Sequence, residues 1–336
     1  MNGAVTVGHY WLLAAVGVAA AALTLLLDLS GFAHGWLAAV VAWSAWPLGS
    51  LALLLAHALT GGRWGDALRP GLLAGVATLP LLPLLILPVL LTLPQLYPWV
   101  RDAAPNGWYL NVPFFAGRGV AYLLVWLGLA WVVLSGRPLE AVAAPGLLLL
   151  ALTVTFASID LTMSLQPRFV SSIYGMLSGA GAGVLALSAA ILLAGVPHPV
   201  RNDVAKLLFA LVLLWAYLSF MQVVIVWQND LAEQVPWYKL RTGGGWGWVM
   251  ALVAIGHGVA PMAVLLSARA RHSARALAWV AAVLVGMSVL RAMWTVLPES
   301  PGVLPLLSAI ACLAAVGGLA GAVALRHRGR EAAIHA

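Results

Sequence analysis

Long apolar runs, separated by short polar stretches, follow one another along the whole of this sequence. About 20 apolar residues cross the hydrocarbon core of a membrane as an α-helix, and these runs are too long and too continuous for the alternating strands of a barrel. Ten such runs lie near residues 9–27, 35–59, 71–96, 113–135, 141–163, 170–195, 204–227, 245–267, 274–297 and 303–325. The pattern predicts an all-α polytopic membrane protein of about ten transmembrane helices, in which residues 1–336 form a single integral membrane domain.

Composition agrees with this pattern and narrows the chemistry. Charged residues make up 8% of the sequence, against about 25% in an average soluble domain, and the mean hydropathy is +1.00. Cys312 is the single cysteine, so the chain can anchor neither an iron–sulfur cluster nor a c-type haem. His34 and His57 lie at opposite ends of one predicted span and His257 has no partner at its depth, which argues against haem b. We expect no metal centre on this chain.

The distribution of basic residues predicts the orientation in the membrane. An even number of spans puts both termini on one side, and eleven of the 17 Lys and Arg residues fall in segments on that side, four in the opposite loops and two within spans. Loops rich in Lys and Arg stay in the cytoplasm. We therefore expect a protein of the bacterial cytoplasmic membrane with both termini cytoplasmic and a first span that is retained rather than cleaved, and we expect no nucleic-acid partner.

Charged residues within the spans are the first candidates for function. Arg118, near the start of the fourth span, and Asp160, near the end of the fifth, lie at a similar depth of about 8 Å inside the outer face, counting ~1.5 Å per residue. Such charges are costly in lipid and tend to face the bundle interior and to pair. We expect Arg118 to pair with Asp160, and a structural ion-pair role for Arg291 in the ninth span.

The polar residues of the outer half also support a functional hypothesis. Asp160 and Glu233 would carry protons along a hydrated cavity open to the periplasmic side, with His257 as a deeper station. The alternative is that Arg118 and Asp160 form a purely structural pair and that the other polar side chains only reach the membrane interface.

Three stretches carry a resemblance to a known family. They are "YLNVPFFAGRGVAYLLVW" (109–126), "SIDLTMSLQPRFVSSIYG" (158–175) and "DVAKLLFALVLLWAYLSFMQVVIVWQNDLAEQVPWYKLRTGGGW" (203–246). Together they resemble the ten-span ActF subunits of bacterial alternative complex III, in the NrfD-like (polysulfide-reductase membrane subunit) superfamily. Arg118, Asp160, Gln222 and Glu233 match the family pattern. The sequence departs from it at Leu161, Arg168, Asp230, Ala232 and Gln234.

The resemblance implies a membrane subunit of a respiratory quinol:cytochrome c oxidoreductase, rather than an enzyme that acts alone. It implies an NrfD-like fold of two four-helix bundles with flanking helices. It also implies partners in electron transport: a homologous NrfD-like subunit, an iron–sulfur subunit and c-type cytochromes, which hold the iron–sulfur clusters and haem c, and beyond them the quinone pool and a terminal oxidase. No cofactor is implied on this chain beyond quinone or quinol, and Gln222, Arg168 and Asp230 are the residues expected to face it.

Two other functions stay open. The chain could be a scaffold whose polar residues only hold the redox subunits in place. It could also be an independent transporter that uses the third span, where Pro80, Pro83, Pro88 and Pro94 predict a bent or broken helix.

Overall fold

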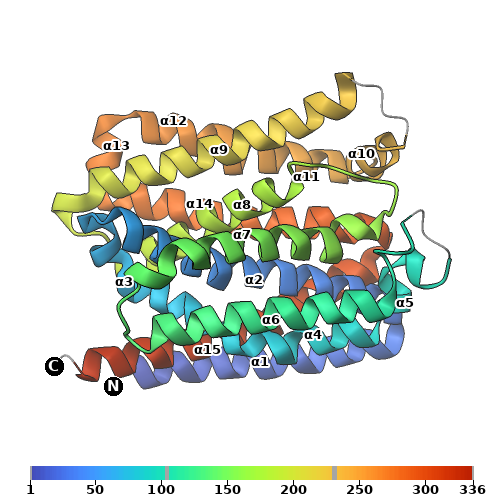
Figure 1. Cartoon of the computed structure of the whole chain (residues 1–336), viewed down its shortest axis with the longest axis horizontal. Coiled ribbons are helices and arrows are strands. Elements are labelled where there is room, and N and C mark those ends of the chain that lie inside the picture. Colours follow the sequence, from blue (N-terminus) through green and yellow to red (C-terminus); the bar gives the residue numbers. More distant parts are fainter. Residues whose placement is uncertain (1, 103–105, 229–232, 335–336) are drawn as a thin grey trace.

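The computed structural model describes residues 2–102, 106–228 and 233–334, and the elements in these ranges are all helical (Figure 1). Ten helices or broken helices are long and apolar enough to cross a membrane. They are α1 (Asn2–Leu27), α2 (Leu29–Thr60), α3 with α4 (Arg63–Val76 and Leu82–Leu91), α6 (Val112–Leu134), α7 (Glu140–Leu161), α8 (Tyr174–Ala194), α9 (Arg201–Gln228), α11 with α12 (Trp246–Val253 and Ala260–Leu266), α14 (Ala274–Val296) and α15 (Val303–Ile334). The prediction of a ten-span all-α membrane protein is confirmed.

Shorter elements connect or interrupt these helices. They are η1 (Leu79–Leu81), α5 (Leu93–Leu96), η2 (Pro98–Val100), η3 (Met163–Leu165), η4 (His198–Val200), α10 (Val235–Thr242), the π-helical turn η5 (Ala254–Val259), α13 (Ala268–His272) and η6 (Leu297–Glu299). The chain begins and ends at one end of the bundle (Figure 1). Asp160 and α10 lie towards the opposite end, called the far end below.

Several span boundaries differ from the prediction, and the early starts of the second and third spans have local causes. The second span begins at Leu29 rather than near 35, because the Asp28 carboxylate accepts a hydrogen bond from the backbone N–H of Gly31 (2.9 Å) and caps the helix. The third begins at Arg63 rather than near 71, because α2 ends at Gly61 and Gly62, whose φ angles of +67° and +104° few other residues adopt. A hydropathy pattern misses such polar helix ends.

The third span is broken, as its prolines predict. Its α-helical course stops at Val76, resumes through η1, and continues as α4 to Leu91. Pro80 and Pro83 stand at the starts of η1 and α4, where a missing backbone N–H costs little. The indole of Trp36 on α2 donates to the backbone carbonyl of Leu85 (2.8 Å), which ties the broken span to its neighbour.

The spans pack as two four-helix bundles with a flanking pair. In the first bundle α2, α3 with α4, α6 and α7 contact one another around a ring, and in the second α8, α9, α11 with α12, and α14 do the same. Helices α2 and α8 join the bundles and are the most buried, with 72% and 61% of their most apolar stretches buried, against 17% in α1. This arrangement agrees with the bundle architecture expected above.

The flanking pair consists of the first and last spans, which lie side by side (Figure 1). Their backbones approach closely through small residues. A Cβ atom at Gly17 would collide with the backbone of Ala315, and one at Gly318 with the backbone of Ala14. Close contact between glycine-lined backbones is the usual way in which helices associate in lipid.

Candidate functional site

An ion pair between Arg118 of α6 and Asp160 of α7 forms one wall of the candidate site. Arg118 Nη2 lies 2.7 Å from Asp160 Oδ1, and Nε lies 2.9 Å from Oδ2, so the two groups meet through a pair of hydrogen bonds. Asp160 is only 2% exposed. The structure thus brings together the two residues whose depths predicted a pair.

The surroundings of this ion pair satisfy both partners. Nη1 of Arg118 donates to the backbone carbonyl of Tyr109 (3.0 Å), and the guanidinium lies 3.8 Å from the centre of the Tyr109 ring and 4.4 Å from that of Phe114. The Tyr122 hydroxyl donates to Asp160 Oδ2 at 2.7 Å. Burial, together with the charge of Asp160, raises the pKa of Tyr109 above its usual value, so this phenol stays neutral.

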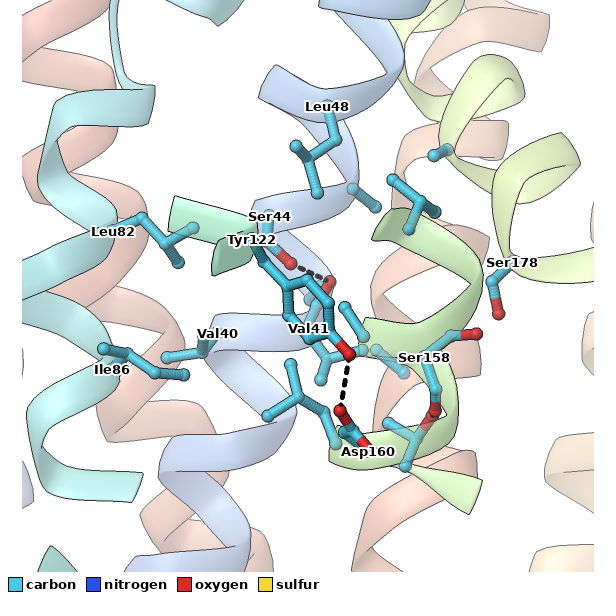
Figure 2. A pocket seen from close by; sticks show the side chains of 18 of the residues that line it. Val40, Val41, Ser44, Leu48, Leu82, Ile86, Tyr122, Ser158, Asp160 and Ser178 are labelled. Carbon is cyan, nitrogen blue, oxygen red and sulfur yellow. Dashed lines mark hydrogen bonds between the residues drawn. The ribbon is translucent and has the colours of Figure 1, made fainter. Parts of the chain in front are cut away.

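Asp160 and Tyr122 face a cavity of about 220 Å³, called cavity A (Figure 2). Residues of α2, α4, α6, α7, α8 and α14 line it, so it lies in the first bundle and reaches the second. In Figure 2 the apolar side chains of Val40, Leu82 and Ile86 lie to one side of Tyr122, whose hydroxyl points at Asp160. Cavity A is therefore a mainly apolar space with one carboxylate in its wall.

A second cavity of about 400 Å³, cavity B, lies in the second bundle. Residues of α8, α9, α10, α11, η5, α12 and α14 line it. Gln222, expected to face a quinone, lies in its wall, 5% exposed, and its Oε1 accepts a hydrogen bond from the Ser171 hydroxyl (3.3 Å). The cavities share four lining residues: Tyr174, Ser178, Arg291 and Thr295.

The surroundings of Arg291 differ from the ion pair that the sequence predicted for it. Within the described residues no acid lies in ion-pair contact with it, its Nε has no hydrogen-bond partner, and its guanidinium donates no hydrogen bond. The expected structural ion pair is wrong because Asp160 already pairs with Arg118, and Glu299 at the end of the same span pairs with Arg241. Arg291 lies instead between the two cavities, which it lines on both sides.

His257, expected to be a deeper proton station, is completely buried in the π-helical turn η5. Its Nε2 lies 3.1 Å from Ser288 Oγ, within hydrogen-bond distance, and Ser288 Oγ also lies 2.8 Å from the Leu284 carbonyl oxygen. The imidazole lies 4.1 Å from the Trp215 ring. Because Ser288 lines cavity A, His257 is one hydrogen bond away from that cavity. A π-helical turn often marks a functional position.

The other predicted residues lie elsewhere. Glu233 is exposed in the turn before α10 and lines neither cavity, so the structure does not group it with Asp160. Arg168 is exposed between η3 and α8, and it too lines neither cavity, which argues against its facing a quinone held there. Asp230 lies outside the described residues.

A second buried ion pair was not predicted. Arg241 of α10 is fully buried, and its Nη2 lies 2.7 Å from Glu299 Oε1 and donates to the Thr295 carbonyl. Its guanidinium also lies 4.1 Å from the centre of the Trp237 ring. Burial lowers the pKa of Arg241 and Glu299 opposes this shift, so the arginine stays charged. The pair fastens α10 to the end of α14.

The sequence did not predict several side chains that line the cavities, although helical spacing offers a signal for two of them. Tyr122 follows Arg118 by four residues and Ser288 precedes Arg291 by three, so each shares a helix face with a charged residue. Nothing in the spacing of Ser178 distinguishes it from other serines. No group of three His, Cys, Asp or Glu side chains suited to a metal occurs in the ranges that the structure describes.

Comparison of the sequence with protein-family models and with curated proteins found no match. The chemistry of the site therefore rests on its geometry. Cavity A has a carboxylate in its wall, and the junction of the two cavities holds a guanidinium without an acceptor among the described residues.

Proposed function

We propose that this chain is the membrane subunit of a respiratory quinol:cytochrome c oxidoreductase of the alternative complex III type, and that Asp160 carries protons along the wall of cavity A. The observation that supports this proposal is the buried network of Arg118, Asp160 and Tyr122, in which Arg118 and Asp160 match the family pattern and Asp160 and Tyr122 line the cavity. Partner subunits would hold the haem and iron–sulfur groups, because this chain has one cysteine.

His257 supplies a second station in this proposal. Its hydrogen bond to Ser288 links it to cavity A, and the Asp160 carboxylate lies in the wall of the same cavity. A proton path needs titrating groups joined by hydroxyls or water, and water in the mainly apolar cavity A would find its partners at Asp160, Tyr122 and Ser288. Cavity A thus connects two titratable side chains from different bundles.

A scaffold remains the second candidate, and one observation favours it. Asp160 accepts three hydrogen bonds, two from Arg118 and one from Tyr122, as a purely structural carboxylate would. In that case the network would hold α6 against α7 and carry no proton.

Purification of the tagged protein in a mild detergent tests the assignment to a redox complex. Recovery together with c-type haem, seen in reduced-minus-oxidised spectra, and with an iron–sulfur subunit would support it. Recovery of the chain alone and colourless would contradict it and favour an independent transporter.

A charge-balanced double variant separates proton transfer from scaffolding. Asp160→Asn alone leaves Arg118 buried without its acid, which destabilises by itself. Arg118→Gln with Asp160→Asn removes both charges and keeps two groups that can hydrogen-bond. If Asp160 carries protons, this double variant assembles but loses quinol oxidation. If the network is a scaffold, assembly and activity survive together. Asp102→Asn, an exposed carboxylate in the loop after η2, is the matched control.

A further inference from the structure

Arg291 stands where the two cavities meet. It is partly exposed, and the surface that it exposes faces cavities A and B. A Cβ atom at Gly181 on α8 would lie 2.7 Å from Arg291 Nη2 and 3.2 Å from Cζ. The guanidinium therefore occupies space that only a glycine leaves open, flat against α8.

The positive charge of Arg291 needs an anion close to it in this position. Arginine stays protonated in proteins, and an unpaired charge within a membrane bundle is costly. Asp160 and Glu299 are each bonded to another arginine. The part of the chain that the structure describes supplies no other acid to Arg291.

The hydroxyls around Arg291 are mostly occupied, with one exception. Tyr174 donates to Thr162, Ser288 to the Leu284 carbonyl and Thr295 to the Arg291 carbonyl. Ser178 lines both cavities and makes no hydrogen bond with the described residues. The indole N–H of Trp215, which lines cavity B beside Gly181, also has no partner among the described residues. The junction thus offers the donors of one guanidinium, one hydroxyl and one indole, beside two mainly apolar spaces.

We propose that Arg291 and Ser178 bind the carboxylate of a long-chain fatty acid or similar monoanionic amphiphile, whose hydrocarbon chain occupies cavity B. A guanidinium matches a carboxylate through two parallel hydrogen bonds and balances its single charge. This site does not depend on the redox assignment above.

The walls favour this ligand over two others. A phospholipid headgroup carries several polar atoms, and one free hydroxyl and one free indole N–H near Arg291 cannot satisfy them. A small inorganic anion would neutralise Arg291 but would leave the apolar volume of about 400 Å³ in cavity B unfilled.

Equilibrium binding of tritiated oleate to the full-length protein in nanodiscs, or to the complex with which it purifies, tests the proposal. We expect saturable binding in which methyl oleate competes at least about tenfold more weakly than oleate, since the ester lacks the charge. Sodium acetate should not displace oleate. Arg291→Gln should weaken binding by at least about tenfold, Arg291→Lys by less, and Ser178→Ala by a few-fold.

Control measurements distinguish loss of the site from misfolding and from unspecific binding of oleate among the lipids around the protein. Arg101→Gln, which removes an exposed charge near the far end, should bind oleate as the wild type does. If Arg291→Gln fails to give a monodisperse protein, Ser178→Ala and the ester comparison still decide. Equal competition by methyl oleate, full displacement by acetate, unchanged binding by a folded Arg291→Gln protein, or no saturable binding in the wild type would each overturn the proposal.

Discussion

Arg118 and Arg291 are both arginines within membrane spans towards the far end of the bundle, but the surroundings of their guanidinium groups differ. Arg118 has a carboxylate, a carbonyl and two aromatic rings around its guanidinium. Arg291 has two cavities and no acceptor among the described residues. The depth of an arginine in the membrane therefore predicts that it needs an anionic partner. It does not predict whether that partner comes from the protein or from a ligand.

This difference indicates two roles: Arg118 stabilises the helix bundle, and Arg291 is available to bind a ligand. A satisfied charge contributes to holding helices together, and its loss leaves another charge unpaired. An unpaired charge lowers the stability of the empty protein, and a ligand that pairs with it raises the stability again. The predictions below test this contrast, beginning with the largest expected effect.

Arg118→Gln should be the most damaging of the single changes. It leaves the Asp160 carboxylate buried with only Tyr122 as a donor, and such a loss lowers the free energy of unfolding by about 3 to 5 kcal/mol. Denaturant titration in detergent measures it, with Arg101→Gln as the control. Equal stability of the two variants would mean that Arg118 is not the partner on which Asp160 depends.

Arg241→Gln extends the contrast to the second buried pair. It removes the partner of Glu299 and three donors to the Thr295 and Trp237 carbonyls. We expect a loss of about 1 to 3 kcal/mol, less than for Arg118, because Glu299 is partly exposed and keeps its contact with Gln166. The same titration measures it. A loss larger than that of Arg118→Gln would reverse the ranking.

Gly181→Ala should displace Arg291 without removing it. The new methyl group would lie 2.7 Å from Nη2, and because a flexible side chain can move, the cost should be about 1 kcal/mol. Gly179→Ala on the same helix meets nothing within 4 Å and shares the change in helix propensity, so the difference in unfolding free energy between the two variants isolates the collision. Oleate affinity should fall in the first variant only.

Arg291→Gln should change stability least. Without a partner to lose, the empty protein should keep its free energy of unfolding within about 0.5 kcal/mol or gain slightly. The informative measurement is the stabilisation by added oleate, which should be present in the wild type and absent in the variant. Destabilisation as large as that of Arg118→Gln would show that the protein itself supplies a partner for Arg291.

The sequence predicted those features that depend on hydropathy and depth. The ten spans follow from apolar length, and the Arg118–Asp160 pair follows from counting residues from the ends of two consecutive helices. Depth does not say which way a side chain points around its helix. For that reason Arg291 was expected to pair and does not, and Glu233 was grouped with Asp160 although it lies exposed before α10.

The sequence also did not predict the contacts between segments that lie far apart in the chain. Arg241 lies in a short helix between spans and Glu299 at the end of another span, 58 residues apart, and neither is marked by periodicity. The cavities depend on how α8 and α14 of the second bundle pack against the first bundle, which no local pattern encodes. The resemblance of residues 109–126, 158–175 and 203–246 to a known family supplied the expected function, and it remains a proposal.

The contact between α1 and α15 has a consequence for how the protein is made. A chain enters the membrane from its N-terminus, so α1 remains in lipid with its small-residue face uncovered until α15 has been synthesised. A chain that stops before residue 303 never covers that face, and we expect membrane proteases to recognise it. Pulse-chase labelling of a chain truncated after residue 302 should show faster degradation than the full-length protein. The contact between α1 and α15 would then act as a check that the tenth span has been made.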